Sequence, residues 1–253
     1  MKVSSGSFSN YTLEVPIQNP FSLPAHEFWQ RIEPAGTYET NPASGYREGF
    51  PASFSDKRQL LLPIRERDAG RYALASLIIN QASFSVVDEL AAALALQLHA
   101  QSIDVIIGIP TLGLTLAEAT ARKLGHARYI ALGTSRKFWY DDALSVSMSS
   151  ITSPDQRKQL FIDPRMLPLL KDKRIAVVDD VVSTGSSMVA ALSLMALCDV
   201  SPVCIGCAMR QGRRWHSQLA KQASSLEERV FSPLSTPSLI PHPKGGWQSA
   251  ESA

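Results

Sequence analysis

Two adjacent aspartates lie between an apolar run and a small, polar turn in residues 174–187, RIAVVDDVVSTGSS. The run Ile175–Val178 is apolar and rich in β-branched residues, which is typical of a strand buried on both faces of a parallel sheet. Asp179 and Asp180 follow where we expect that strand to end. From Ser183 to Ser187 the chain is small and polar, and it then becomes apolar in a pattern typical of a helix. The segment therefore predicts a strand, a loop and a helix N-terminus in succession.

The predicted loop has the features of a phosphate site. A helix N-terminus offers free backbone N–H groups and the positive end of a dipole, and this loop adds several hydroxyl groups. The two carboxylates would repel a phosphate, but they suit sugar hydroxyls or a magnesium ion. We therefore expect a sugar phosphate as ligand. The alternative is a capped helix beside a solvated acidic pair, and a nucleotide P-loop is disfavoured because no lysine follows Gly185.

The segment Val177–Ser187 resembles the phosphoribosyl-pyrophosphate (PRPP) motif of the type I phosphoribosyltransferases, in which two acids are followed by two apolar residues and a Thr/Gly/Ser turn. The resemblance implies an α/β fold with a mostly parallel five-stranded sheet, helices on both faces and a variable hood over the site. It implies an enzyme that transfers the phosphoribosyl group of PRPP to a nitrogenous base and releases pyrophosphate. It also implies Mg²⁺ as cofactor and a homodimer.

The resemblance assigns roles to the residues of this motif. Asp179 and Asp180 are expected to be catalytic residues that hold the ribose hydroxyls and Mg²⁺. The residues expected to bind the 5′-phosphate of PRPP are Ser183, Thr184, Gly185, Ser186 and Ser187. In the family the bond to pyrophosphate breaks well before the base attacks, so catalysis is expected to depend on positioning and charge stabilisation.

The segments on either side of the motif predict alternating strands and helices. Strands are expected at Asp104–Ile109, Arg128–Leu132 and Val203–Met209, and helices at Ser85–His99 and Leu114–Leu124. This order predicts a parallel sheet with right-handed crossovers and a site at the carboxyl ends of its strands.

A turn after the first of these strands is the expected pyrophosphate loop. Thr111, Leu112 and Gly113 occupy the position at which the resembled family grips pyrophosphate through backbone N–H groups. A Gly/Pro turn at a strand end is common on its own, and its place before the acidic motif is what supports this role.

Residues 133–172 show little regular pattern, apart from a short expected strand at Leu160–Ile162. Long irregular segments within compact domains are often functional lids, and the resembled family has a flexible catalytic loop here. Arg136 and Lys137 are therefore expected catalytic residues that contact the pyrophosphate oxygens. The alternative is a solvated basic pair.

Two residues are candidates for binding the base. Arg210 follows the strand Val203–Met209, where purine members of the family contact an exocyclic oxygen of the base. Asn80 lies in SLIINQ, which resembles the base-reading stretch of bacterial xanthine phosphoribosyltransferases. Arg210 favours a 6-oxopurine as substrate, while orotate and adenine remain open. The alternatives are a surface arginine and an asparagine in a turn.

Composition divides the chain into three parts. Residues 1–57 are rich in Pro, Ser, Asn and Gly with scattered aromatics, and are expected to form an N-terminal arm or hood. Residues 58–225 are the expected phosphoribosyltransferase core. Residues 226–253 are the expected C-terminal arm, with one strand at Arg229–Phe231 and a Pro-rich run ending at Trp247. That run either covers the base pocket or packs on the core.

Charge and cysteine content narrow the class of protein. Lys plus Arg number 25 and Asp plus Glu 23, and this net charge of +2 does not suggest a nucleic-acid binder. The longest apolar runs are too short to span a membrane and no signal-like segment opens the chain, so we expect a cytoplasmic protein with free thiols. Cys204 and Cys207 form a C-x-x-C pair inside an expected strand, which favours core packing over a metal site.

Two other classes of protein remain open. One is a regulatory protein that binds PRPP and transfers nothing, although no DNA-binding module is visible. The other is an unrelated α/β protein that uses its acidic pair for a metal ion alone. Measured binding of PRPP distinguishes the second from the first.

Overall fold

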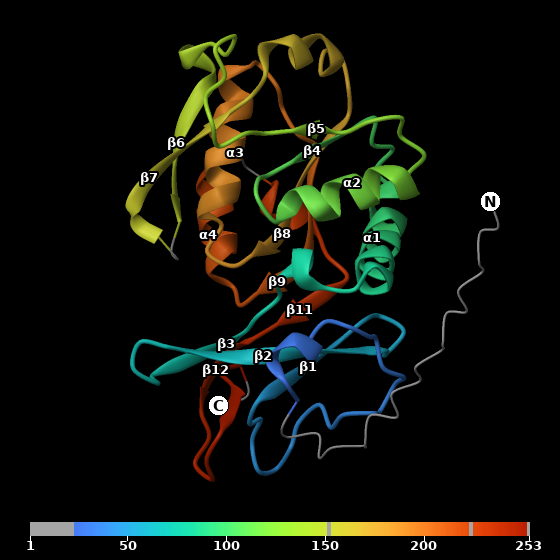
Figure 1. Cartoon of the computed structure of the whole chain (residues 1–253), viewed down its shortest axis with the longest axis vertical. Coiled ribbons are helices and arrows are strands. Elements are labelled where there is room, and N and C mark those ends of the chain that lie inside the picture. Colours follow the sequence, from blue (N-terminus) through green and yellow to red (C-terminus); the bar gives the residue numbers. More distant parts are fainter. Residues whose placement is uncertain (1–22, 151–152, 223–224, 252–253) are drawn as a thin grey trace, which may run out of the picture.

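Two sheets organise the part of the chain that the computed structural model describes, residues 23–150, 153–222 and 225–251. A parallel sheet with its helices forms the larger unit, and an antiparallel sheet lies across from the carboxyl ends of its strands (Figure 1). The first 22 residues, which belong to the expected N-terminal arm, lie outside the described residues. No helix in the described ranges has both the length and the apolar character needed to cross a membrane.

The parallel sheet has five strand positions, as predicted. Its strands are β4 (Val105–Gly108), β5 (Ile130–Ala131), β8 (Ile175–Val182), β9 (Cys204–Gln211), β10 (Val230–Phe231) and β11 (Leu234–Thr236). Their order is β10-β9-β8-β4-β5, all parallel, and β11 pairs with β9 further along the same edge. The central β8 is apolar because both of its faces are covered, and Val177 and Val178 are fully buried.

Helices cover both faces of this sheet. On one face, α1 (Phe84–His99) and α2 (Gly113–Lys123) share an apolar core with alternate side chains of β8 and β9. On the other, α3 (Ser186–Leu197) packs against the remaining side chains, with α4 (Arg214–Gln222) beside it (Figure 1). The predicted helices at 85–99, 114–124 and 188–197 are confirmed to within two residues at each end.

Strand β8 is longer than the sequence predicts. We expected it to end at Asp179, but it continues to Val182, because β9 is equally long and pairs with it beyond the acidic residues. Asp179 lies opposite Cys207 and Val182 opposite Arg210. The acidic pair is therefore held inside the sheet and not in the loop that follows.

The antiparallel sheet takes strands from distant parts of the chain. Its order is β1 (Gly49–Ser53), β2 (Gln59–Arg67), β3 (Tyr72–Ala75), β12 (Ser238–Pro241) and β13 (Trp247–Ser249). Residues 59–75, within the range assigned from sequence to the core, thus form β2 and β3 of this second sheet.

The C-terminal part is more regular than predicted. The sequence suggested one strand followed by a Pro-rich run, but the structure has β11, β12 and β13 after β10, with Pro237 and Pro241 at strand ends where a missing N–H costs little. Trp247 is buried, and its N–H and C=O each make a 2.7 Å hydrogen bond with the backbone of Tyr46. The sequence predicts that the Pro-rich run either covers the base pocket or packs on the core, and Trp247 at its end packs on the core.

Residues 133–172 are also more regular than predicted. They contain a β-hairpin, β6 (Ser145–Ser150) and β7 (Ser153–Phe161), between two short 3-10 helices, Asp142–Leu144 and Pro164–Leu169. Val146 and Met148 alternate with serines, a period-2 pattern that indicates a strand with one apolar face. Met148 joins the core beside α3, which is why the hairpin is ordered against that helix.

The cysteine pair lies in the core. Cys204 and Cys207 are free, fully buried on β9, and burial raises the pKa of each thiol to about 12. Such thiols are neutral and poor metal ligands at neutral pH. This agrees with the core packing predicted from sequence.

The turn between β12 and β13 provides a test of the Tyr46–Trp247 pairing. Gly246 has φ +74°, and a Cβ atom there would lie 2.3 Å from the carbonyl oxygen of Tyr46. Gly245 has φ +88° with open space around it. We expect Gly246→Ala to lower the free energy of unfolding by about 2–4 kcal/mol and Gly245→Ala by about 1 kcal/mol, because only the first adds a clash to backbone strain.

Urea unfolding of the two variants and the wild type measures this difference. Equal losses for the two substitutions would mean that the contact between the turn and Tyr46 is absent in solution.

Candidate active site

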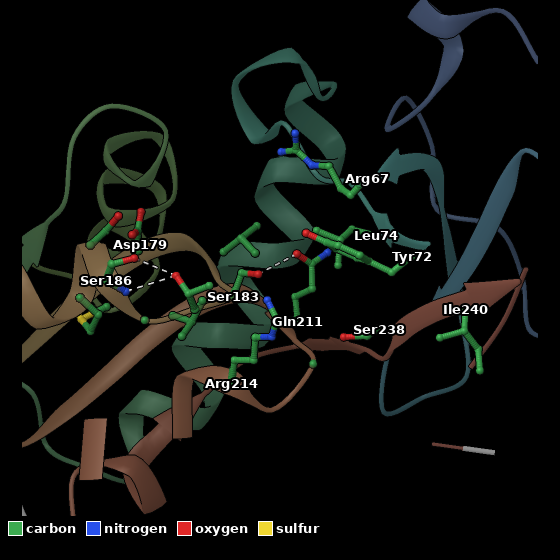
Figure 2. A pocket seen from close by; sticks show the side chains of 17 residues that line it. Arg67, Tyr72, Leu74, Asp179, Ser183, Ser186, Gln211, Arg214, Ser238 and Ile240 are labelled. Atoms are coloured by element: carbon green, nitrogen blue, oxygen red, sulfur yellow. Dashed lines mark hydrogen bonds between the residues drawn. The ribbon is translucent and has the colours of Figure 1, made fainter. Parts of the chain in front are cut away.

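A cavity of about 440 Å³ lies between the two sheets. One wall is made by the end of β8 and the loop before α3, and the other by β2, β3 and β12, with the start of α4 closing one side (Figure 2). Figure 2 shows Asp179 and Ser186 on one side of the cavity, and Arg67, Tyr72 and Ile240 on the other, with Ser183 and Gln211 between them. The cavity therefore joins the predicted phosphate loop to a surface that the sequence did not predict.

The loop before α3 has the geometry of an anion site. Gly185 has φ +86° and forms the N-cap of α3, which has no side-chain cap within the described chain. The hydroxyls of Thr184 and Ser186 lie 2.8 Å apart at the same helix end. Uncapped N–H groups, the helix dipole and these hydroxyls together suit a phosphate group. All five predicted residues, Ser183, Thr184, Gly185, Ser186 and Ser187, line the cavity.

Of the two predicted acidic residues, Asp179 lines the cavity together with this loop and Asp180 does not. Asp179 is only 7% exposed, and its Oδ1 accepts a 2.9 Å hydrogen bond from the backbone N–H of Asp180. Burial, and then the neighbouring charge of Asp180, raise the pKa of Asp179 well above its ordinary value. Burial also raises the pKa of Asp180. A hydroxyl donor or a cation beside this pair would favour the ionised form of each carboxyl.

The turn after β4 packs directly against Asp179. Thr111 and Leu112 precede Gly113, the first residue of α2, and the peptide bond between Pro110 and Thr111 is cis. A Cβ atom on Gly113 would lie 2.7 Å from Asp179 Oδ1, so only glycine fits at this position. The predicted pyrophosphate loop and the acidic pair are thus neighbours, although Thr111, Leu112 and Gly113 do not line the cavity itself.

The facing wall was missed by the sequence analysis. Its side chains belong to Arg67, Tyr72, Leu74, Arg214, Ser238 and Ile240. The guanidinium of Arg214 lies 5.9 Å from the centre of the Tyr72 ring, a cation–π distance that orders both side chains. A sequence signal for part of this wall was present, because Asp68-Ala69-Gly70 contains residue types that favour a hairpin turn, and in the structure these three residues have positive φ.

Gln211 connects the two walls. Its Oε1 accepts a 3.0 Å hydrogen bond from the Ser183 hydroxyl, and its Nε2 donates a 2.5 Å hydrogen bond to the carbonyl oxygen of Ala75 on β3. The side chain is only 7% exposed, so both bonds are sheltered from water. Gln211 therefore fixes the phosphate loop relative to the antiparallel sheet.

The two residues predicted to bind the base lie elsewhere. Arg210 precedes Gln211 on β9, and because successive side chains of a strand point to opposite faces, Gln211 lines this cavity and Arg210 does not. Asn80 is an exposed residue of the 3-10 helix Ile79–Gln81, whose Ile79 is buried, and it also lies off the cavity wall.

The predicted basic pair also lies off the cavity wall. Arg136 and Lys137 are exposed in the loop that follows β5. Arg136 makes a bidentate hydrogen-bonded ion pair with Asp142, at 2.5 and 3.1 Å. Its guanidinium is therefore occupied by a carboxylate of its own loop in this structure.

The metal-binding potential of the site rests on Asp179 and Asp180. No cluster of three or more His, Cys, Asp or Glu side chains suited to a metal ion occurs within the described ranges. Carboxylate oxygens are ligands that Mg²⁺ prefers, and the ion keeps further ligands from water or substrate oxygens. Its positive charge would oppose the burial that raises the pKa of both groups. The donor set thus fits a cation that a phosphorylated substrate brings with it.

Comparisons with known proteins agree with this geometry. Residues 74–233 match the family model described as phosphoribosyl transferase domain. No curated protein sequence matches the chain. Among solved structures, the APRTase from Giardia lamblia, complexed with 9-deazaadenine, has 18% identity and a TM-score of 0.50 over 60% of this chain and 80% of its own.

Two further structures are similar to this chain. The adenine phosphoribosyltransferase from Thermoanaerobacter pseudethanolicus has 15% identity and a TM-score of 0.47, covering 60% of this chain and 81% of its own. The purine phosphoribosyltransferase from Pyrococcus horikoshii has 24% identity and a TM-score of 0.37, covering 51% and 74%. At these identities the likeness, carried by the Giardia structure, concerns the fold alone.

The raised pKa values predict a pH dependence of stability. Folded Asp179 keeps its proton at pH values at which the unfolded chain, with an ordinary pKa of 3.8, has lost it. Unfolding then releases protons, so this carboxyl lowers the free energy of unfolding as pH rises above about 4. We expect Asp179→Asn to be more stable than the wild type by about 1 kcal/mol at pH 7.5, with the difference shrinking towards pH 4.

Urea unfolding at several pH values between 4 and 8 measures this effect. Asp88→Asn, on the exposed side of α1, controls for the loss of one negative charge. A difference that grows towards pH 4 would contradict a raised pKa for Asp179.

The Gln211 connection also predicts a stability effect. Gln211→Met keeps the side-chain length but leaves the Ala75 carbonyl and the Ser183 hydroxyl without this partner, which we expect to cost about 1–3 kcal/mol of unfolding free energy. The matched control is Gln222→Met, which removes an exposed 2.9 Å hydrogen bond to Ser193 and should cost less than about 0.5 kcal/mol. Equal urea midpoints for the two variants would show that Gln211 does not hold the walls together.

Proposed function

Because this chain belongs to the phosphoribosyl transferase domain family, we propose that it transfers the phosphoribosyl group of PRPP to a nitrogenous base and releases pyrophosphate. The observation that carries the proposal is the cavity in which a buried carboxyl and an uncapped helix N-terminus lie together. A sugar phosphate matches that pair of groups, because its hydroxyls suit the carboxyls and its phosphate suits the helix end.

The sugar phosphate would bind along one wall of the cavity. The 5′-phosphate accepts hydrogen bonds from the N-terminal N–H groups of α3 and from the hydroxyls of Ser183, Thr184, Ser186 and Ser187. Asp179 and Asp180 accept hydrogen bonds from the ribose hydroxyls, which places the anomeric carbon of the sugar towards the facing wall. Gln211 supports this placement by orienting the Ser183 hydroxyl.

The pyrophosphate would lie near the turn after β4. Gly113 packs against Asp179, and Thr111 and Leu112 precede it in the same turn, so a group attached to the ribose would reach the N–H groups of this turn. Arg136 and Lys137 would add positive charge once their loop closes over the substrate. For that, Arg136 exchanges its partner Asp142 for a phosphate oxygen.

Mg²⁺ would be held by Asp179, Asp180 and substrate oxygens. The bound ion supplies positive charge that neutralises the leaving pyrophosphate. The protein supplies position: it fixes the phosphate and the ribose on one rigid strand and loop, and it leaves room for a base on the other side.

The base would lie against the facing wall, between the antiparallel sheet and the sugar. Tyr72 offers a ring for stacking, and Leu74 and Ile240 offer apolar contacts. Arg67 and Arg214 are donors only, so they match carbonyl oxygens of a base better than amino groups. This favours an oxo-substituted base, with a 6-oxopurine as the first candidate.

The two sheets would each bind a different part of the substrates. We assign the hood to the antiparallel sheet, which takes strands from residues 49–75 and 238–249. Its residues form the wall on which the base lies. The parallel sheet with α1–α4 then carries the sugar, phosphate and pyrophosphate groups.

The test is pyrophosphate release from PRPP with Mg²⁺ across xanthine, guanine, hypoxanthine, adenine, uracil and orotate. We expect release with one or a few bases, and at least 100-fold slower release for the double variant Asp179→Asn/Asp180→Asn, because both ribose contacts and the cation ligands are lost. The matched control is Asp172→Asn/Asp199→Asn, two exposed aspartates with positive φ, where asparagine is well tolerated.

Two outcomes would contradict the proposal. Full activity in the double variant at Asp179 and Asp180 would remove the role assigned to the acidic pair. No release with any base, while PRPP still binds in calorimetry, would favour a regulatory protein that binds PRPP and transfers nothing.

A further inference from the structure

A second cavity, of about 760 Å³, lies beside the candidate active site. Arg210 lines it, whereas the next residue of β9, Gln211, lines the first cavity. The two cavities therefore lie on opposite sides of one strand end, and Gly212 borders both. The transfer reaction proposed above uses only the first of them.

Two buried atoms in this second cavity lack a hydrogen-bond partner among the described residues. They are Nε of Arg210, which is a donor, and Oε2 of Glu227, which is an acceptor. A buried polar group without a partner is costly, so its persistence points to a partner that comes from outside the chain. That partner must accept a hydrogen bond at one place and donate one at another.

The other charged or titratable residues that line the cavity also include both basic and acidic side chains. Arg213, just before α4, and His216, in its first turn, also line it, and Glu228 belongs with Glu227 to the segment before β10. One part of the lining thus suits an anion and another suits hydroxyl or amino donors. Inorganic phosphate would satisfy only the first part.

Aromatic side chains complete the lining. Tyr46, Phe50 and Trp215 border the cavity, and they offer apolar surface for a planar ring. A cavity of this size accommodates a ligand that combines an anionic group, hydrogen-bond donors and a ring.

We propose that this second cavity binds a nucleoside 5′-monophosphate. Its phosphate accepts hydrogen bonds from Arg210 and Arg213, and a ribose hydroxyl or an exocyclic amine donates to Glu227. The site does not depend on the transfer reaction, since none of these three residues lines the first cavity.

The second cavity touches the phosphate loop of the first through Trp215. A Cβ atom on Gly185 would lie 3.3 Å from Cα of Trp215, so the start of α4 is packed against this loop. This contact is a route by which a ligand in the second cavity would act on the phosphate loop of the first. By linkage, a nucleotide that alters the affinity for PRPP has its own affinity altered by the same factor.

Isothermal titration of the full chain with the 5′-monophosphates of adenosine, guanosine, inosine and uridine, and with inorganic phosphate, tests the proposal. We expect at least one nucleotide to bind, and to bind about tenfold or more weakly to Arg210→Met and to Glu227→Gln, because each variant removes one charged hydrogen bond. Glu227→Gln changes only one atom and keeps the test valid if Arg210→Met does not fold.

Arg122→Met, on the exposed surface of α2 and outside both cavities, is the matched control for the loss of one positive charge. It should leave the nucleotide affinity within about twofold. Because a nucleoside 5′-monophosphate is also the product of the proposed transfer, binding that is unchanged in both Arg210→Met and Glu227→Gln would place the nucleotide in the first cavity and overturn the proposal. So would the absence of nucleotide binding, or phosphate binding as tightly as every nucleotide with no effect of Glu227→Gln.

Discussion

The burial of the Asp179 carboxyl inside the parallel sheet is the constraint on which the rest of the candidate site depends. A carboxyl at the centre of a sheet loses its water, and this raises its pKa. The surrounding chain packs closely around this carboxyl. Gly113 has no side chain, and a Cβ atom there would overlap Asp179, while β9 continues to pair with β8 beyond Asp179. A hydroxyl donor or a cation that binds this carboxyl in the cavity therefore gains more interaction free energy than it would at the surface.

The last two side chains of β9 line different cavities, because successive residues of a strand point to opposite faces. Gln211 lines the first cavity and Arg210 the second. A shift of one residue in the register between β8 and β9 would exchange these two positions. The two strands pair from Ala176 to Val182, which makes that shift costly, so the chemistry of both cavities rests on the same backbone pairing.

The sequence predicted the parts of the fold that short-range pattern determines. Buried strands such as Ile175–Val178 and the helices that follow them have local signals, and the phosphate loop was found from fourteen consecutive residues. The facing wall depends on pairing between β3 and β12, more than 160 residues apart, and no local pattern contains that information. Arg210 was expected just after a strand that ends at Met209, but β9 continues to Gln211, and the side of the strand on which Arg210 lies depends on the register with β8.

The order of the strands along the chain has a consequence for how the cavity forms. Strands β2 and β3 emerge early in synthesis, and their partner β12 emerges only near residue 240. The hydrogen bonds between β3 and β12 cannot form until the whole parallel core has been made. An incomplete chain thus exposes the edge of β3, which is a surface for pairing with other chains. The cavity, whose wall includes Ser238 and Ile240 of β12, is therefore complete only after the C-terminal strands have paired with β3.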